Sequence, residues 1–182
     1  MDSELKYQTQ TQTQTQTQTQ TQTQTQTQTQ TQTQNDSKYL DFFAKNTVAP
    51  NMNFNEILNK MCFIEGNNMI LDYKIMKPII MQNNTYDVVF EHLINVTKEI
   101  LLHNEVMVLH VCLKGLTITD MDKHRNFVLR IIKTFSEQFP NKLNTCNLYK
   151  TPAIFAQIFA LISMFIDKVT INKIRIVKSP PK

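Results

Sequence analysis

The sequence predicts an α/β domain in which helices flank a mainly parallel β-sheet. Short runs that are apolar on both faces, such as residues 106–113, are typical of strands buried inside a sheet. Segments with apolar residues every three or four positions, such as residues 86–102, are typical of amphipathic helices. Because the two kinds of segment alternate along the chain, we expect parallel strands joined by right-handed helical crossovers.

Composition divides the chain into a tail, a lead-in and the domain. Residues 8–34 are an uninterrupted Thr/Gln alternation without a large apolar side chain, so we expect residues 1–37 to be a disordered tail. Strict alternation would also suit self-association through stacked Gln side chains, although a repeat without function is the simpler interpretation. We predict a helical lead-in at residues 38–71 and the domain at residues 72–182.

Each element is predicted from its own local pattern. In the lead-in, a helix ending near Gly66 is indicated by apolar side chains at helical spacing, namely Phe54, Ile57, Leu58 and Met61. Residues 75–81 are β-prone, and Pro78 indicates an edge position in the sheet. The later elements alternate between helix and strand and are expected at residues 86–102, 106–113, 120–138, 144–149, 153–166 and 173–177.

Composition also excludes several classes of protein. Gly66 and Gly115 are the only glycines, so the glycine-rich phosphate-binding motifs are absent. Three widely spaced cysteines, Cys62, Cys112 and Cys146, indicate neither a disulfide framework nor a zinc knuckle. The first residues lack the pattern of a secretion signal, and the longest apolar run falls short of the ~20 residues that a membrane-spanning helix needs. We therefore expect a cytoplasmic protein with reduced thiols.

No residues form a convincing catalytic or metal site. His110 and Cys112 share one face of the strand at 106–113, where they could be metal ligands or a base and a nucleophile, but no further ligand has suitable spacing. Two buried core residues are the favoured interpretation. Asp120 and Asp122 suit the N-terminal end of a helix instead. We therefore predict no enzyme activity, no metal, no cofactor and no nucleic-acid partner.

The helix predicted at residues 153–166 is unusual because it is apolar nearly all round. Such a helix must be buried, contact a membrane or cover an apolar cavity, and burial in the core is the simplest of these options. The chain after this helix is basic, with five Lys or Arg residues and no acidic residue in residues 168–182. That pattern suits phosphate or an anionic membrane surface, or it is an ordinary solvated tail.

Several spaced segments of the chain resemble the CRAL-TRIO lipid-binding family. The strand segment VMVLHVCLKGLT (residues 106–117) is similar to the apolar strand of that family, which ends near a glycine. The segment FPNKLNTCNLYKTPAIF (residues 139–155) resembles its aromatic-Pro motif, a following strand and the start of a helix. FIDKVTINKIRIVK (residues 165–178) resembles the stretch before its last core strand, and KPIIM (residues 77–81) its first strand.

The resemblance implies an apolar pocket between the sheet and a mobile gate helix, with one phospholipid or similar molecule as cargo. The gate helix falls at residues 153–166, and its implied pocket residues are Ile154, Phe155, Ile158, Phe159, Ile162 and Phe165. In family members that bind phosphatidylinositol, a Thr and a Lys contact the head group, and the matching positions here are Thr170 and Lys173. Arg175 and Lys178 are the residues expected to contact phosphate or a membrane.

The chain also departs from the family pattern. Asn141 stands where phosphatidylinositol-binding members carry Glu, and Cys112 stands where the strand carries an acidic residue. The segment after the last strand is short, so we expect a minimal and divergent member. The predicted function is binding and transfer of a phospholipid, with a phosphoinositide favoured, at membrane surfaces. The alternative is a protein-interaction module that keeps the fold without exchanging lipid and binds a protein partner.

Overall fold

The computed structural model describes residues 33–82 and 85–178. Most of the predicted Thr/Gln tail therefore lies outside the described residues. Its last residues, 33–37, are helical and begin a helix that covers residues 33–45. The chain divides into two units, Met1–Asp41 and Phe42–Lys182. The sheet domain belongs entirely to the second unit.

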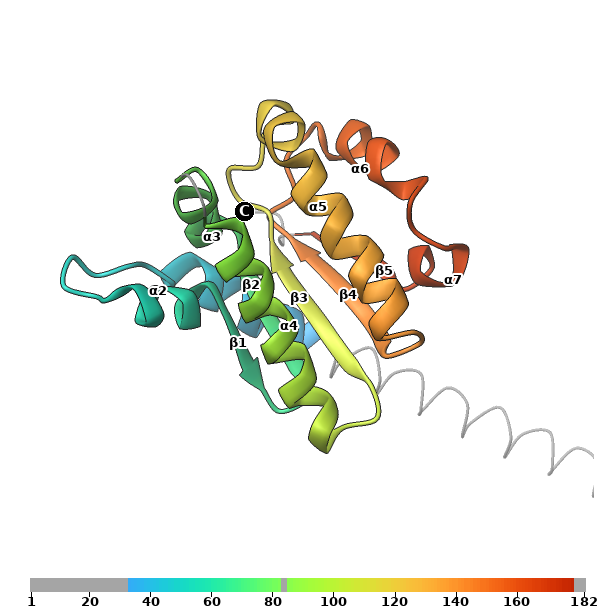
Figure 1. The fold of residues 1–182 in the computed structure, drawn as a ribbon, viewed down its shortest axis with the longest axis horizontal. Helices are drawn as coiled ribbons and strands as arrows, with labels where there is room; N and C mark the ends of the chain where they lie inside the picture. The colour runs from blue at the N-terminus through green and yellow to red at the C-terminus, as the bar shows by residue number, and fades with distance from the viewer. Residues whose placement is uncertain (1–32, 83–84, 179–182) are drawn as a thin grey trace, which may run out of the picture. The chain divides into compact units, whose positions relative to one another are not determined.

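A five-stranded sheet forms the centre of the domain, and its spatial order follows the chain: β1 (Cys62–Glu65), β2 (Asn68–Asp72), β3 (Met107–Cys112), β4 (Leu143–Tyr149) and β5 (Ile174–Val177). The short strand β1 is antiparallel to β2, and the three other neighbouring pairs are parallel (Figure 1). This arrangement confirms the predicted mainly parallel sheet.

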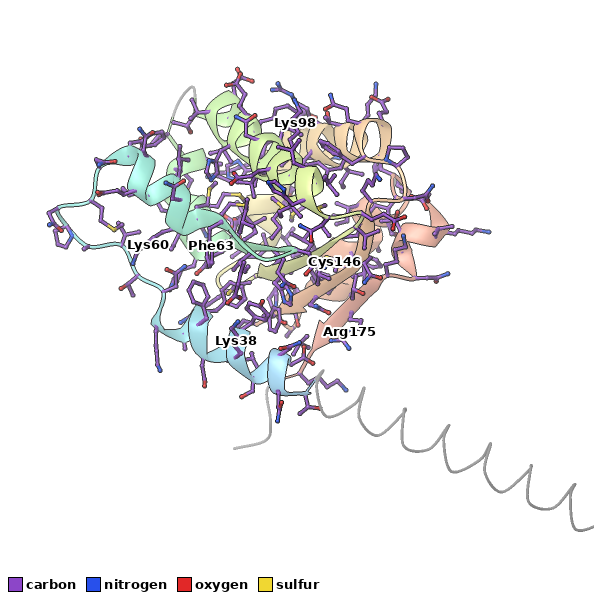
Figure 2. All side chains as sticks on the ribbon, turned by 90° about the horizontal axis from the view of Figure 1, so that it is seen from below. Lys38, Lys60, Phe63, Lys98, Cys146 and Arg175 are labelled. Carbon is purple, nitrogen blue, oxygen red and sulfur yellow. The ribbon has the colours of Figure 1, made fainter. Side chains whose placement is uncertain are left out.

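The helices after the first one are α2 (Phe54–Met61), α3 (Tyr73–Ile80), α4 (Tyr86–His103), α5 (Ile118–Gln138), α6 (Phe155–Ser163) and α7 (Lys168–Ile171). Strands that follow one another along the chain are neighbours, so crossovers of the same hand place their helices on the same face of the sheet. Figure 2 shows α4 and α5 side by side on one side of the strands. None of the helices in the described part of the chain has the length and apolar content needed to cross a membrane.

The start of α5 illustrates how the local sequence sets a helix end. The Thr117 hydroxyl accepts a hydrogen bond from the Asp120 backbone N–H at 3.1 Å, and the Asp120 carboxylate accepts one from the Thr117 N–H at 2.9 Å. This reciprocal capping box satisfies two backbone donors that the first turn leaves free. Asp120 therefore has the helix-end role expected from the sequence, and α5 ends at Gln138, before Pro140.

Two predicted elements are wrong. Residues 75–81 do not form a strand, because Ile75, Met76, Ile79 and Ile80 recur at helical spacing and are the buried side of α3. The first parallel strand is instead β2, which lies almost entirely within the segment expected to be a helical lead-in. It follows β1 through a tight turn in which Gly66 has a φ of 64°, a conformation that glycine adopts without strain. The sheet therefore begins before residue 72.

The face of the sheet opposite α4 and α5 is filled by polar and aromatic side chains. The His110 Nε2–H donates to Asn68 Oδ1 at 3.1 Å, and the Tyr149 hydroxyl donates to His110 Nδ1 at 2.8 Å. The ring of Phe43 packs against Tyr149, with ring centroids 5.4 Å apart. On the neighbouring strand, the Asp72 carboxylate accepts a hydrogen bond from the Asn46 side chain at 3.1 Å. We call this set the polar face of the sheet.

Candidate functional site

A cavity of about 550 Å³ lies between the helix-covered face of the sheet and helices α5, α6 and α7. Its walls are mainly apolar, and polar side chains from the α5–β4 loop and from α7 gather at one end. We call this space the apolar cavity. Its sheet wall consists of side chains from β2 to β5, among them Met69, Leu71, Met107, Leu109, Val111, Leu143, Cys146, Leu148 and Ile174.

The alternation of side chains along each strand decides which residues reach the apolar cavity. Leu109 and Val111 of β3 line it, whereas the intervening His110 makes its hydrogen bonds on the polar face. On β4, Cys146 and Leu148 line the cavity in the same way. Every second side chain of β3 and β4 therefore lies in the sheet wall of the cavity.

Helix α5 supplies a wall that the sequence analysis did not assign to the site. Val128, Ile131, Ile132 and Phe135 line the cavity at helical spacing. The same stripe is recognisable in the sequence as the inward side of an amphipathic helix. The sequence pattern does not show whether such a stripe packs tightly on the sheet or stands away from it, so the stripe alone does not reveal a cavity.

Helix α6 covers residues 155–163 of the segment 153–166 for which a gate helix was expected. Of the six pocket residues predicted for it, five line the apolar cavity, namely Phe155, Ile158, Phe159, Ile162 and Phe165. The sixth, Ile154, is the residue before the first turn and packs against the main core. The helix is shorter than predicted, because it ends at Ser163.

The outer side of this region is apolar and exposed. Leu161 and Met164 are 46% and 72% exposed and do not line the cavity, whereas Phe165 and Val169 are exposed and also border it. The all-round apolar pattern in the sequence therefore has two origins, since one side of the segment lines the cavity and the other faces solvent. Burial in the core, the simplest interpretation of the sequence, accounts only for the inner side.

Thr170 and Lys173 both line the polar end of the apolar cavity. Lys173 is half-buried, and its ammonium group donates to the Leu143 carbonyl at 2.6 Å. The backbone N–H of Thr170 donates to the Asp167 carboxylate at 2.9 Å and caps α7. Hydrogen bonds from the Thr170 side chain and from its backbone lower the pKa of Asp167. Asn141 lines the same end from a turn where its φ is 60°. The ammonium of Lys173, the hydroxyl of Thr170, the amide of Asn141 and the carboxylate of Asp167 thus all belong to residues that line this end of the apolar space.

A family model described as CRAL/TRIO domain matches residues 75–181, which is more than half of the chain. The chain belongs to the CRAL/TRIO domain family. Among solved structures, the domain is similar to the crystal structure of Sfh5, with a TM-score of 0.58 and 20% sequence identity over 70% of this chain. The chain spans about half the length of that protein, since 50% of it is covered. No curated protein sequence matches the chain significantly.

Two residues predicted to contact phosphate or a membrane lie elsewhere in this CRAL/TRIO domain. Arg175 follows the cavity-lining Ile174 on β5, and its guanidinium Nε donates to Asn147 Oδ1 at 2.9 Å on the polar face. Lys178 follows β5 and is exposed. Neither residue lines the apolar cavity, so any contact they make with a membrane is separate from the Thr170 and Lys173 end.

His110 and Cys112 are core residues, which is the interpretation that the sequence favours. His110 is 3% exposed and hydrogen-bonded through both ring nitrogens. Burial raises the pKa of the Cys112 thiol to about 11, so the nucleophilic thiolate is disfavoured at neutral pH. Within residues 33–82 and 85–178, no three His, Cys, Asp or Glu side chains are grouped so that they could hold a metal ion.

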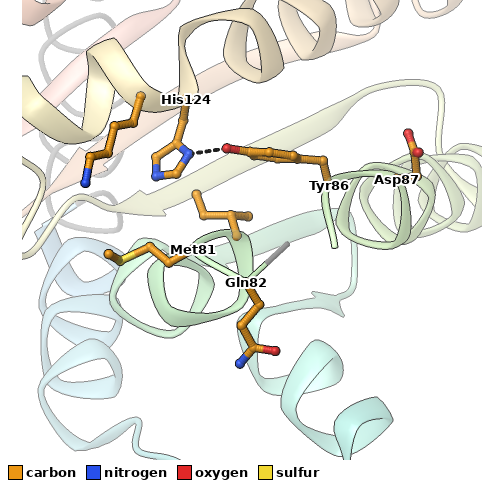
Figure 3. A pocket seen from close by; sticks show the side chains of 7 residues that line it. Met81, Gln82, Tyr86, Asp87 and His124 are labelled. Atoms are coloured by element: carbon orange, nitrogen blue, oxygen red, sulfur yellow. Dashed lines mark hydrogen bonds between the residues drawn. The ribbon is translucent and has the colours of Figure 1, made fainter. Parts of the chain in front are cut away.

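A second, more open cavity of about 630 Å³ lies between the end of α3, the start of α4 and α5. Figure 3 shows the hydrogen bond that links His124 Nδ1 to the Tyr86 hydroxyl, at 2.6 Å, in this cavity. Burial lowers the pKa of His124, which favours the neutral ring. The labelled Gln82 and Asp87 side chains point away from this pair. The polar groups therefore do not converge on one ligand position.

Proposed function

We propose that this CRAL/TRIO domain binds a phospholipid in the apolar cavity and transfers it between membrane surfaces. The observation that carries the proposal is an apolar space of about 550 Å³ with Thr170 and Lys173 at one end. Moving hydrocarbon from water into such a space is worth ~0.8 kcal/mol per CH₂ group. A phospholipid would therefore be held without a covalent bond and released where a membrane offers an equally apolar surrounding.

The polar end supports an anionic head group, and a phosphoinositide is the leading class. Lys173 brings a positive charge with three N–H donors, and Thr170 brings a hydroxyl donor, both suited to phosphate oxygens. Asn141 lines the same end where related phosphatidylinositol-binding members carry Glu. A neutral amide removes one acceptor for inositol hydroxyls, but it also removes a negative charge near the phosphate. The Asp167 carboxylate also lines this end, so the charge of Lys173 has to offset one negative charge there when a phosphate binds.

Opening of α6 would give the lipid its path. The position before its first turn is occupied by Ile154, which provides no side-chain cap for the helix. An uncapped helix end is less stable, typically by ~1 kcal/mol, and such segments open more readily. The exposed side chains of Leu161, Met164 and Phe165 would then contact the bilayer, with basic side chains of the C-terminal segment attracted to anionic lipid head groups. We expect this exchange at the cytoplasmic side of membranes.

Native mass spectrometry of the purified full chain tests the proposal directly. The expected result is a protein peak with one lipid bound, either carried through purification or taken up from liposomes. A protein that stays empty after incubation with mixed phospholipid liposomes, yet forms a stable oligomer or a complex with another protein, would instead identify an interaction module. Uptake of lipid thus separates the two functions that the sequence leaves open.

The head-group role of Lys173 is tested by charge reversal. Lys173→Glu should weaken uptake of phosphatidylinositol about tenfold and leave phosphatidylcholine uptake nearly unchanged, because a charge-assisted hydrogen bond is worth ~1.5–3 kcal/mol. Lys168→Glu is the matched control, since it reverses a charge at the start of α7 on a residue that does not line the cavity. Equal losses for both lipids, or equal losses in both variants, would remove Lys173 from the head-group site.

A further inference from the structure

The size of the apolar cavity limits its cargo. At ~30 Å³ for each water-sized group, which is close to the space taken by a methylene, a volume of about 550 Å³ holds roughly 18 such groups. Because the polar end belongs to the same cavity, these groups include the glycerol phosphate, and what remains is enough for one acyl chain. A phospholipid with two long chains carries about twice that amount of hydrocarbon. We infer that the cargo is a single-chain lysophospholipid, with its phosphate at Lys173 and its chain in the apolar cavity. This inference rests on the proposed function.

Contacts of α6 with the sheet explain why the cavity is small. Phe155 is buried in a cluster with Val111, Cys146 and Leu148 of β3 and β4. Ile158 is 1% exposed and belongs to the main core together with sheet residues of β2 and β3. Helix α6 therefore rests on the strands through one side of its first turns. The open space is confined between this contact, α5 and α7.

The distribution of polar groups gives the cargo an orientation. Thr170, Lys173, Asn141 and the acidic Asp167 lie at one end, and most of the remaining wall is apolar. The wall also contains four methionines, Met69, Met76, Met107 and Met121. Thioether side chains are flexible and adapt to irregular apolar shapes, which suits a mobile chain better than a rigid ring system. A single anionic group joined to a single chain matches this arrangement.

A chain-length series measures the capacity of the cavity. Binding of lysophosphatidic acids with saturated chains of increasing length, kept below the concentration at which they form micelles, can be followed by titration calorimetry of the full chain. Affinity should rise about fourfold for each added methylene, from ~0.8 kcal/mol per CH₂ group, and should stop rising below roughly 18 carbons, because the glycerol phosphate occupies part of the cavity. A fatty acid of the same length should bind more weakly, because it lacks the phosphate. Equal affinity for the fatty acid would overturn the phosphate assignment.

Widening the cavity provides a second measurement. Phe159→Ala removes a half-buried ring from the cavity wall, so the length limit for single-chain lipids should move to longer chains. Leu161→Ala on the exposed side of the same helix is the control and should leave the limit in place.

Two outcomes separate the failure of this inference from the failure of the proposed function. If the unmodified protein binds a two-chain phosphatidic acid as tightly as the lysophosphatidic acid, the single-chain inference is wrong and lipid binding stands. If it binds no member of either series, lipid binding itself fails. A length limit below roughly 18 carbons that moves only in Phe159→Ala supports the inference.

Discussion

The two faces of the sheet are built by the same strands and have opposite properties. On β3 and β4, Leu109, Val111, Cys146 and Leu148 line a hollow apolar space. The residues between them, His110, Asn147 and Tyr149, are buried on the polar face and take part in its hydrogen bonds. The polar face carries directional contacts that define one packing arrangement, whereas the cavity face leaves room for a ligand.

This difference indicates how the domain keeps its shape around an empty space. A cavity forfeits dispersion contacts and lowers the stability of the face that surrounds it. Hydrogen bonds between buried partners are strong and specific because the interior is of low dielectric constant. We infer that contacts on the polar face hold the strands in place. The residues of the cavity face then need not pack tightly against one another and can line a binding site. Three predictions test this division.

The largest difference should come from removing one aromatic side chain on the polar face. Tyr149 is fully buried, so Tyr149→Ala should lower the free energy of unfolding by about 4 kcal/mol. Ile131→Ala, in the wall of the cavity, should cost only about 1 kcal/mol, because its side chain is half-buried and borders space that is already empty. Urea denaturation measures both values. Similar losses in the two variants would show that the faces contribute equally.

A smaller change isolates the hydrogen bond. Tyr149→Phe keeps the ring and removes the hydroxyl that donates to His110 Nδ1, which leaves a buried nitrogen without this partner. The expected loss in the free energy of unfolding is about 1–2 kcal/mol. Lipid uptake by the variant should be unchanged, since neither residue lines the apolar cavity. Unchanged stability would mean that the ring alone, and not the hydrogen bond, holds the polar face.

The smallest effects concern pH, and two carboxyl groups should act in opposite directions. Burial raises the pKa of Asp72 above 3.8, despite the hydrogen bond from Asn46 and the charge of Lys74. The native state then keeps this proton to a higher pH than the unfolded state does, so stability falls as the pH rises from 3.8 through the native pKa.

Asp120 should act in the opposite direction. Burial also disfavours its ionised form, but hydrogen bonds from Lys77 and Thr117 outweigh the effect of burial and lower the pKa of Asp120. Its contribution is present above 3.8 and is lost as the pH falls below that value.

Urea denaturation at a series of pH values separates these groups. Asp72→Asn should flatten the dependence of stability on pH above 3.8, and Asp120→Asn should flatten it below 3.8. Each variant serves as the control for the other, because both remove one carboxylate that accepts hydrogen bonds from the start of a helix. If both variants altered the same pH range, the opposite environments assigned to the two groups would be wrong.

Much of the fold could be predicted from the sequence where the apolar pattern is long. The segments that became α4, β3 and α5 are each marked by a period of 3.6 or by a continuous apolar run. The hairpin of β1 and β2 was missed because both strands are short and follow a capped helix without a clear break. The strand expected at residues 75–81 rested on apolar composition. The structure follows the spacing of the apolar residues instead, which is helical for Ile75, Met76, Ile79 and Ile80.

The candidate site could be predicted only in part. The segment of α6 and α7 was expected to supply residues around a pocket, and Phe159 and Lys173 line the apolar cavity; their role in binding stays a prediction. The share contributed by α5 and by the methionines of the core could not be predicted, because no pattern in a single sequence distinguishes a packed interior from a hollow one. Whether Arg175 and Lys178 contact a membrane stays a prediction.

The position of Cys146 makes its alkylation a measure of how often the apolar cavity opens. Its thiol lines the apolar cavity but is 7% exposed, and burial raises its pKa to about 12, so an alkylating reagent reacts with it slowly in the closed state. Cys112 is fully buried and lies on strand β3 next to Asp72 of β2, away from the cavity wall. Movement of α6 would expose Cys146 alone, whereas global unfolding would expose both. The ratio of the two alkylation rates, followed by peptide mass spectrometry, therefore reports how often the cavity opens within the intact fold.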